Sequence, residues 1–168
     1  MNTKIIDIIS QFNCIHEGEL WVGTNFMDKV SGITEGTAFI RPIPQIHSIA
    51  EIMAHLTIWN QDTAYKIRNK KGKVLDNSPE NWRSNATLQE IGWSQLKTDY
   101  EQSILEIVVL LGSKSDTFLQ ETYNDIDFKK EQPFQFAIDG LLHHTVYHLG
   151  QIGITIKLLI SKELHVPF

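Results

Sequence analysis

An unbroken helical pattern near the end of the chain constrains the fold more than any other sequence feature. Apolar residues recur three or four positions apart from Phe134 to Ile160. This period predicts a helix of about thirty residues that begins near Pro133, a residue suited to a first helical turn, and ends near Ser161. Residues 152–156 are rich in β-branched side chains, so a strand there is the competing interpretation. The helical period continues through them, which favours the helix.

Three further segments carry the same period. The first is expected from about Thr3 to Trp21, and one or two short helical turns are expected within residues 26–38, where glycines interrupt the pattern. The second begins at Ser48, whose side chain and that of Glu51 form the two halves of a capping box, and it ends near Asn69.

The third helix is expected to begin with another capping box at residues 87–90 and to run to about Leu111. The polar stretches at residues 70–85 and 112–132 are then long loops. Four long amphipathic helices with two long connections predict an all-α fold, a four-helix bundle with long crossover connections. The length suits one domain, residues 1–168.

Composition and charge exclude several classes of protein. Hydrophobic residues make up 42% of the chain and charged residues 21%, which is typical of a globular protein and excludes global disorder. The net charge of −5 disfavours a nucleic-acid partner. The single cysteine, Cys14, permits no intrachain disulfide and no cysteine-based zinc site. No run approaches the roughly 18 apolar residues of a membrane helix, and no export signal is evident, so we expect a cytoplasmic protein.

Two of the seven histidines are spaced to bind one ion. His144 and His148 lie four residues apart on the predicted last helix, so their side chains share a face, whereas His143 projects elsewhere. A metal site open to substrate commonly has three protein ligands, so a third must come from another helix. His55, which flanks the apolar stripe of the second helix, is the best candidate. The alternative interpretation is that His55 is a buried histidine with an ordinary hydrogen-bond partner.

The segment around this histidine pair resembles a known family. Residues 144–152, HTVYHLGQI, are similar to the His-x-x-Tyr-His-x-Gly-Gln-Ile signature of the DinB/YfiT-like superfamily. Residues 42–59 resemble that family's second-helix block, and residues 19–24 resemble its Trp-x-Gly segment. The three blocks occur in the family's order.

The resemblance implies a DinB/YfiT-like four-helix bundle in an up-down-down-up arrangement, often a homodimer. It also implies a divalent metal ion held by three histidines, which correspond here to His55, His144 and His148. Zinc or nickel is the leading expectation, with iron or manganese as alternatives. Characterised relatives include thiol-dependent S-transferases and isomerases, so a small-molecule substrate, and a low-molecular-weight thiol in particular, is the expected partner.

A metal ion with three neutral imidazole ligands keeps its double positive charge and can activate a bound water or a bound thiol. The first outcome would give a hydrolase and the second a thiol S-transferase. Gln151, one turn beyond His148, could hold a water, a substrate or a ligand in place, and Glu51, one turn before His55, could be a hydrogen-bond acceptor for a ligand or a general base. The capping box is the competing explanation for Glu51.

Two other functions remain open at this stage. In one, the chain is a non-enzymatic dimeric metal-binding module of the stress-response kind, with all coordination positions filled or walled off. In the other, it is a partner-binding helical domain without an ion. In the enzyme, residues 21–44 and the loop at residues 70–85 are expected to roof a pocket beside the metal.

Overall fold

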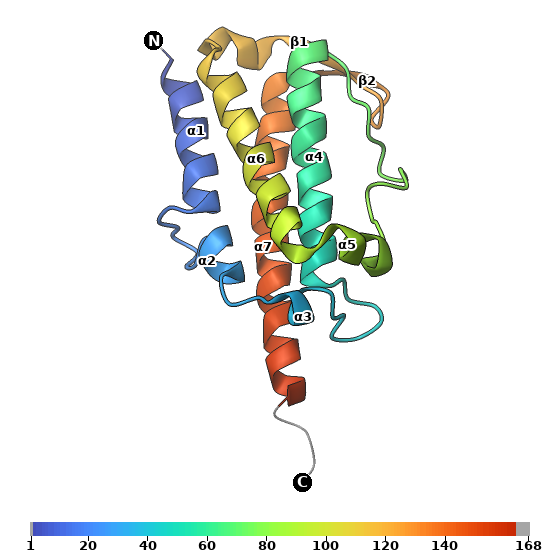
Figure 1. Cartoon of the computed structure of the whole chain (residues 1–168). Helices are drawn as coiled ribbons and strands as arrows, with labels where there is room; N and C mark the ends of the chain where they lie inside the picture. The colour runs from blue at the N-terminus through green and yellow to red at the C-terminus, as the bar shows by residue number, and fades with distance from the viewer. Residues whose placement is uncertain (1, 164–168) are drawn as a thin grey trace.

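The computed structural model describes residues 2–163 and contains four long helices packed side by side. They are α1 (Thr3–His16), α4 (Ile49–Asn69), α6 (Trp93–Gly112) and α7 (Phe134–Glu163). Helices α1 and α7 run in one direction along the bundle and α4 and α6 run in the other (Figure 1). This confirms the expected all-α bundle and its up-down-down-up order. The expected domain spans residues 1–168, of which residue 1 and residues 164–168 lie outside the described part.

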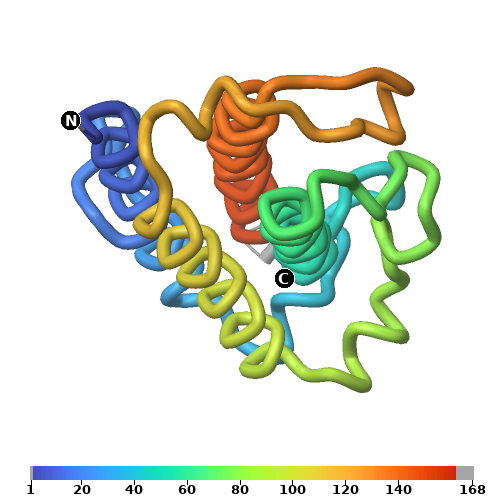
Figure 2. The backbone as a smooth tube through the Cα atoms, turned by 90° about the horizontal axis from the view of Figure 1, so that it is seen from above, coloured from blue at the N-terminus to red at the C-terminus, as the bar shows by residue number. Residues whose placement is uncertain are grey.

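The hydrophobic core lies where the four helices meet, because each turns its apolar stripe inward. Helix α4 packs against both α6 and α7, and α1 packs against the opposite sides of α6 and α7. The side of α4 and α7 that faces away from α1 is therefore not covered by a helix of the bundle (Figure 2). The connecting segments cover that side.

The start of α4 is formed as the sequence predicts. The Ser48 side chain accepts a hydrogen bond from the backbone N–H of Glu51, and the Glu51 carboxylate accepts one from the backbone N–H of Ser48, at 2.8 Å. These two bonds satisfy backbone donors that the first turn of a helix leaves free. The helix ends at Asn69, and the next residue, Lys70, takes a left-handed conformation.

One helix boundary differs from the expectation, because α1 ends at His16 rather than near Trp21. The short helical turns expected within residues 26–38 are confirmed as α2 (Phe26–Val30) and α3 (Glu35–Ala38). The chain turns closely at Gly18, where a Cβ atom would lie 2.9 Å from the Cα of Cys14. A side chain at this position would clash with the helix, so the turn requires glycine.

The expected third helix is divided into α5 (Asn85–Ile91) and α6, and the predicted capping box at residues 87–90 is wrong. The cap is Ser84, whose side chain accepts a hydrogen bond from the backbone N–H of Thr87. The division occurs at Gly92, which has a φ of +86°. This conformation ends one helix and starts the next at an angle, and it is accessible to glycine at little cost.

The segment expected as a loop at residues 112–132 contains a 3₁₀ helix, η1 (Asp116–Gln120), and a β-hairpin formed by β1 (Thr122–Asp125) and β2 (Lys130–Pro133). The strands pair antiparallel, with Thr122 opposite Pro133. Two backbone hydrogen bonds fasten the hairpin to the segment that follows α4: the Asn124 N–H donates to the Lys70 carbonyl, and the Gly72 N–H donates to the Asn124 carbonyl. The hairpin and this segment therefore lie together on the uncovered side of α4 and α7 (Figure 2).

Helix α7 is continuous through residues 152–156, so the competing strand interpretation is wrong. Ile152 and Thr155 are fully buried there, since tertiary packing outweighs their modest helix propensity. Within residues 2–163, no helix combines the length and the apolar character that crossing a membrane would require.

Candidate metal centre

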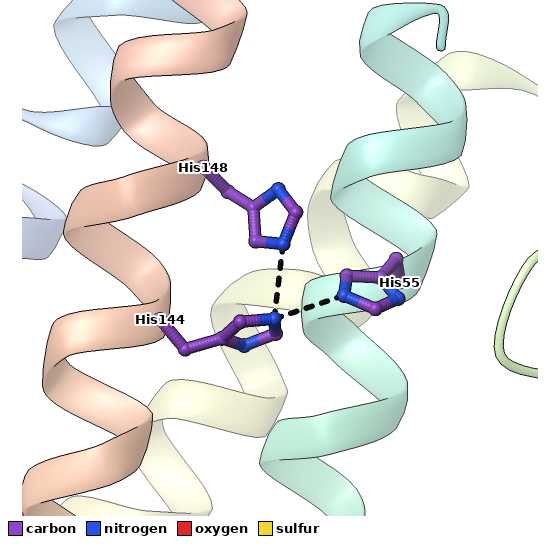
Figure 3. A group of neighbouring side chains, drawn as sticks. All are labelled: His55, His144 and His148. Atoms are coloured by element: carbon purple, nitrogen blue, oxygen red, sulfur yellow. Dashed lines mark hydrogen bonds between the residues drawn. The ribbon is translucent and has the colours of Figure 1, made fainter. Parts of the chain in front are cut away.

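Three histidine side chains from two neighbouring helices converge between those helices (Figure 3). His55 projects from α4, and His144 and His148 project from consecutive turns of α7 (Figure 3). The Nε2 atom of His144 lies 2.9 Å from the Nε2 atom of His55 and 2.9 Å from that of His148. The ligand atoms of all three lie within 4.8 Å of one another. The structure thus brings together the three residues that the sequence singled out as ligands.

The ring of His55 is held in place by the loop between α4 and α5. Its Nδ1–H donates to the backbone carbonyl of Asn81 at 3.2 Å, so its Nε2 atom presents a lone pair toward the other two histidines. The indole of Trp82 stacks on the same ring, with centroids 3.9 Å apart and planes 10° apart. On its other face Trp82 stacks on His47, again at 3.9 Å. The loop therefore sets both the tautomer and the orientation of His55.

The ring of His148 is held by its own helix. Its Nδ1–H donates to the side-chain oxygen of Gln151 at 2.6 Å, and the amide nitrogen of Gln151 donates to the Tyr147 hydroxyl at 2.8 Å. This leaves the Nε2 lone pair of His148 directed at the centre of the cluster. Among the roles that the sequence suggested for Gln151, the geometry supports holding a ligand in place.

Burial keeps the three imidazoles neutral. It lowers the pKa of His55 to about 4, although the hydrogen bonds of Asn81 partly oppose the effect. It lowers the pKa of His148 to about 4 as well. The pKa of His144 falls to about 3, because the two neighbouring imidazoles add to the effect of burial. At neutral pH all three rings are therefore in the form that binds a metal ion.

The donor set fits a divalent metal ion. His55 and His148 carry their protons on Nδ1, so the Nε2 atom of each is an acceptor. Both acceptors face Nε2 of His144, which has at most one proton to donate, so within the cluster at least one of them lacks a donor. A metal ion would bind the lone pairs of all three Nε2 atoms. A 2.9 Å separation is compatible with two nitrogens that each lie about 2.1 Å from a shared ion. Imidazole nitrogen suits zinc, nickel and iron alike, so the ligand set does not select one of them.

Glu51 lies one turn before His55 but is not brought to the cluster. Its carboxylate accepts hydrogen bonds from the Arg41 guanidinium and from the backbone N–H of Ser48. Burial alone would raise the pKa of Glu51, but the hydrogen bonds and charge of Arg41, with the Ser48 N–H, hold it below its usual value. The geometry gives Glu51 a role in capping α4 and in an ion pair, and it does not place the carboxylate as an acceptor or base beside the histidines.

A cavity of about 680 Å³ opens beside the three histidines. It lies between α4 and α7 on the side that the bundle leaves uncovered, and its outer wall consists of Asp76 and Trp82 from the loop and Tyr123, Asp125 and Phe128 from the hairpin. The expectation that the loop at residues 70–85 forms part of the roof is confirmed. The expected contribution of residues 21–44 is wrong, because the hairpin occupies that place instead.

Sequence reasoning missed the residues that orient the metal ligands from outside their helices. Asn81 and Trp82 carry no motif, and their loop has no periodicity that would predict where it packs. The one available signal was the tryptophan itself, because a large aromatic side chain within a polar stretch needs a surface to bury against.

The comparisons with known proteins agree with this geometry. The sequence profile of the DinB superfamily matches residues 21–152, a range that contains all three histidines. Among curated proteins, no match was found.

Proposed function

Since the chain belongs to the DinB superfamily, we propose that it is a metal-dependent enzyme that acts on a small molecule, with thiol S-transfer as its reaction and hydrolysis as the alternative. Family membership and the histidine cluster fit a metal-binding helical protein. The observation that carries the enzymatic proposal is the cavity that all three histidines line. Zinc or nickel is the first choice of ion, with iron or manganese as alternatives.

The chain's own residues have three tasks in this proposal. His55, His144 and His148 hold the ion, and Gln151 holds the ring of His148. The cavity admits the substrate from the side of the hairpin. When bound, a divalent ion supplies Lewis-acid chemistry and lowers the pKa of a thiol or water that reaches it.

The surroundings of the cluster support thiol transfer over hydrolysis. Water has a pKa of 15.7 and a thiol about 8.5, so water needs far more help from the site to become a nucleophile. A neighbouring general base would give that help. Glu51, the base that the sequence suggested, is engaged by Arg41 and is not brought to the histidines.

The test is turnover of electrophiles by protein loaded with zinc or nickel. A panel of low-molecular-weight thiols with an aryl halide tests transfer, and a panel of esters without thiol tests hydrolysis. The control is a variant in which His55, His144 and His148 are all alanine. We expect thiol consumption well above this control. If no thiol or ester reacts faster with the loaded protein than with the triple variant, the enzymatic proposal is wrong.

The competing function is a non-enzymatic metal-binding module, which requires that coordination positions be filled or walled off. Cobalt(II)-loaded protein distinguishes the two, because a thiol that reaches an open ion produces a thiolate-to-metal absorption band. An unchanged cobalt spectrum at saturating thiol would favour the module. The open cavity beside the histidines supports the enzyme.

A further inference from the structure

The cavity continues well beyond the three histidines and ends at a buried lysine. We propose that this end is a subsite for the tail of the substrate, in which the Lys66 ammonium binds a hydrogen-bond acceptor such as an amide carbonyl or a carboxylate. This inference rests on the proposed function, because it takes the other end of the same molecule to react at the histidines. It identifies the substrate as an elongated molecule with an apolar middle.

The length of the cavity follows from the helices that form it. His55, Trp59, Thr63 and Lys66 all line the cavity and lie on one face of α4. The eleven steps from His55 to Lys66 raise the backbone by about 16 Å along the helix axis, at 1.5 Å per residue. The Trp59 ring lies between the two side chains, 6.3 Å from the His55 ring and 5.7 Å from Lys66 Nζ. On the facing helix α7, the lining residues extend from Phe136 to Gln151. A volume of about 680 Å³ distributed over this length suits an extended ligand.

The walls between the two ends are aromatic. Trp82 lies against the histidines, Trp59 lies between the histidines and Lys66, and Tyr123 lies beside Lys66, while Phe128 and Phe136 complete the lining. The rings of Phe128 and Phe136 meet edge to face at 5.4 Å, and both side chains are exposed, so they form the rim of the cavity. A surface of this kind binds an apolar or aromatic segment and gives a charged segment no partner.

The Lys66 side chain is held in place by its neighbours, and its ammonium keeps N–H donors that Asp62 does not use. Its side chain is 10% exposed, and its Nζ atom lies 2.9 Å from a carboxylate oxygen of Asp62. The rings of Trp59 and Tyr123 flank the ammonium, with centroids 5.7 Å and 5.4 Å away. Gly72 packs on the stem so closely that a Cβ atom there would lie 2.9 Å from Cε of Lys66. An ammonium has three N–H donors and Asp62 occupies one direction, so an acceptor entering the cavity can use another.

The neighbouring carboxylates decide which tail fits. Asp62 is fully buried and accepts hydrogen bonds from the backbone N–H groups of Lys73 and Val74. Asp125 accepts from the Tyr123 hydroxyl and from two backbone N–H groups of the hairpin turn. Among the residues that the structure describes, Asp62 Oδ2 faces only the Lys66 ammonium, at 2.9 Å, so an alkylammonium tail at this end would meet the like charge of Lys66 before it could reach that oxygen. Together Asp62 and Asp125 carry two negative charges against the single positive charge of Lys66, so a neutral carbonyl suits the site better than a carboxylate does.

The test measures the binding of three aryl thiols of equal length to zinc-loaded protein by calorimetry. Their tails reach the far end of the cavity and end in a carboxylate, a primary amide or an ammonium. We expect the amide tail to bind at least about 10-fold more tightly than the ammonium tail. The two acceptor tails distinguish an anionic from a neutral substrate. Equal affinities for all three tails in the unaltered protein would overturn the subsite.

A double variant, Asp62→Asn with Lys66→Met, tests whether Lys66 is responsible. Asparagine keeps an oxygen for the N–H groups of Lys73 and Val74, so no charge remains buried without its partner. We expect the preference for the amide tail to disappear in this variant. Lys114→Met is the matched control, since Lys114 also lies over an aromatic ring, that of Phe118, but away from the cavity. A preference that persists in the double variant would contradict the role of Lys66.

A short aryl thiol without a tail separates the two proposals. If it binds the zinc-loaded protein while the three tails show no difference, the proposed function stands and the subsite is wrong. If neither the short thiol nor any tailed thiol binds, both proposals fail. The wild-type panel alone decides the subsite if the double variant does not fold.

Discussion

At the scale of single residues, the position of a histidine within its helix turn separates a metal ligand from a surface residue. His143 and His144 are adjacent in the chain, yet His143 is exposed and His144 lies between His55 and His148. Adjacent side chains on a helix point about 100° apart, so one of them can face the cavity while its neighbour faces solvent.

We predict that His144→Ala lowers the affinity for zinc by at least about 100-fold, because it removes the central ligand of the three. His143→Ala is the matched control and should leave the affinity unchanged. Competition with a chromogenic chelator measures both. Equal affinities in the two variants would show that the ion, if bound, lies elsewhere.

Residues that hold the ligands in place should also affect the affinity for zinc. We predict that Trp82→Ala weakens zinc binding roughly 10-fold, because Trp82 stacks on His55 and supports the orientation of its ring. Trp21→Ala removes an indole that is 98% exposed and serves as the control. The chelator assay applies here too, and a loss in the Trp21 variant as large as that in the Trp82 variant would count against a positioning role.

At the scale of elements, a single backbone conformation divides α5 from α6. Gly92 has a φ of +86°, and the Trp93 N–H that follows donates to the Glu35 side chain at 2.9 Å. The junction thus connects the segment before α4 to the start of α6.

We predict that Gly92→Ala destabilises the protein by about 1–3 kcal/mol, because a φ of +86° with a ψ of +148° is a conformation that residues with a Cβ atom rarely adopt. Gly112→Ala is the matched control, because Gly112 lies in helical geometry and a Cβ atom there meets nothing within 4 Å. That variant should be neutral or more stable by up to about 1 kcal/mol. Urea unfolding compares the two, and an equally stable Gly92 variant would contradict the strain argument.

The elements also show what the sequence could and could not predict. The start of α4 is encoded locally by Ser48 and Glu51, and the continuity of α7 by its apolar period, so both were predictable. The hairpin was not, since its strands, TYND and KEQP, are polar and contain a proline. It forms because Tyr123 packs against Phe134 and because Asp125 accepts the N–H groups of the turn, contacts that depend on the fold.

The candidate site divides in the same way. Spacing within α7 predicted the pair of histidines, and the third ligand came from the family resemblance. The contacts made by Asn81, Trp82 and the hairpin could not be read from the sequence, because loops acquire their positions from what they pack against.

At the scale of the whole molecule, the buried histidines couple stability to pH. Their pKa values are about 3 to 4 in the folded protein, below the 6.5 of an exposed histidine. Between these values the unfolded chain binds protons that the folded chain does not, so acid favours unfolding.

We predict that the metal-free protein loses stability steadily as the pH falls from about 6.5 to 5, as measured by urea midpoints. Exchanging all three histidines for glutamine should flatten this dependence. Some slope will remain, since burial also lowers the pKa of His16. Glu51 and Asp125 do not contribute above pH 5, because their carboxyl groups titrate below their usual range. An unchanged slope in the glutamine variant would contradict the prediction.

The homodimer implied by the family resemblance stays a prediction at this scale, and sedimentation equilibrium tests it directly.

Because α4 and α7 both supply ligands, metal binding should affect how the protein unfolds. His55 and His144 lie 89 positions apart in the chain, so an ion bound to both closes a long loop of the chain. The ion would act as a removable crosslink that forms only after the two helices have packed together. Amide protons of α4 and α7 should then become more protected from hydrogen exchange together when metal is added. Those of α1, which holds no ligand, should become more protected only to the extent that the free energy of global unfolding rises.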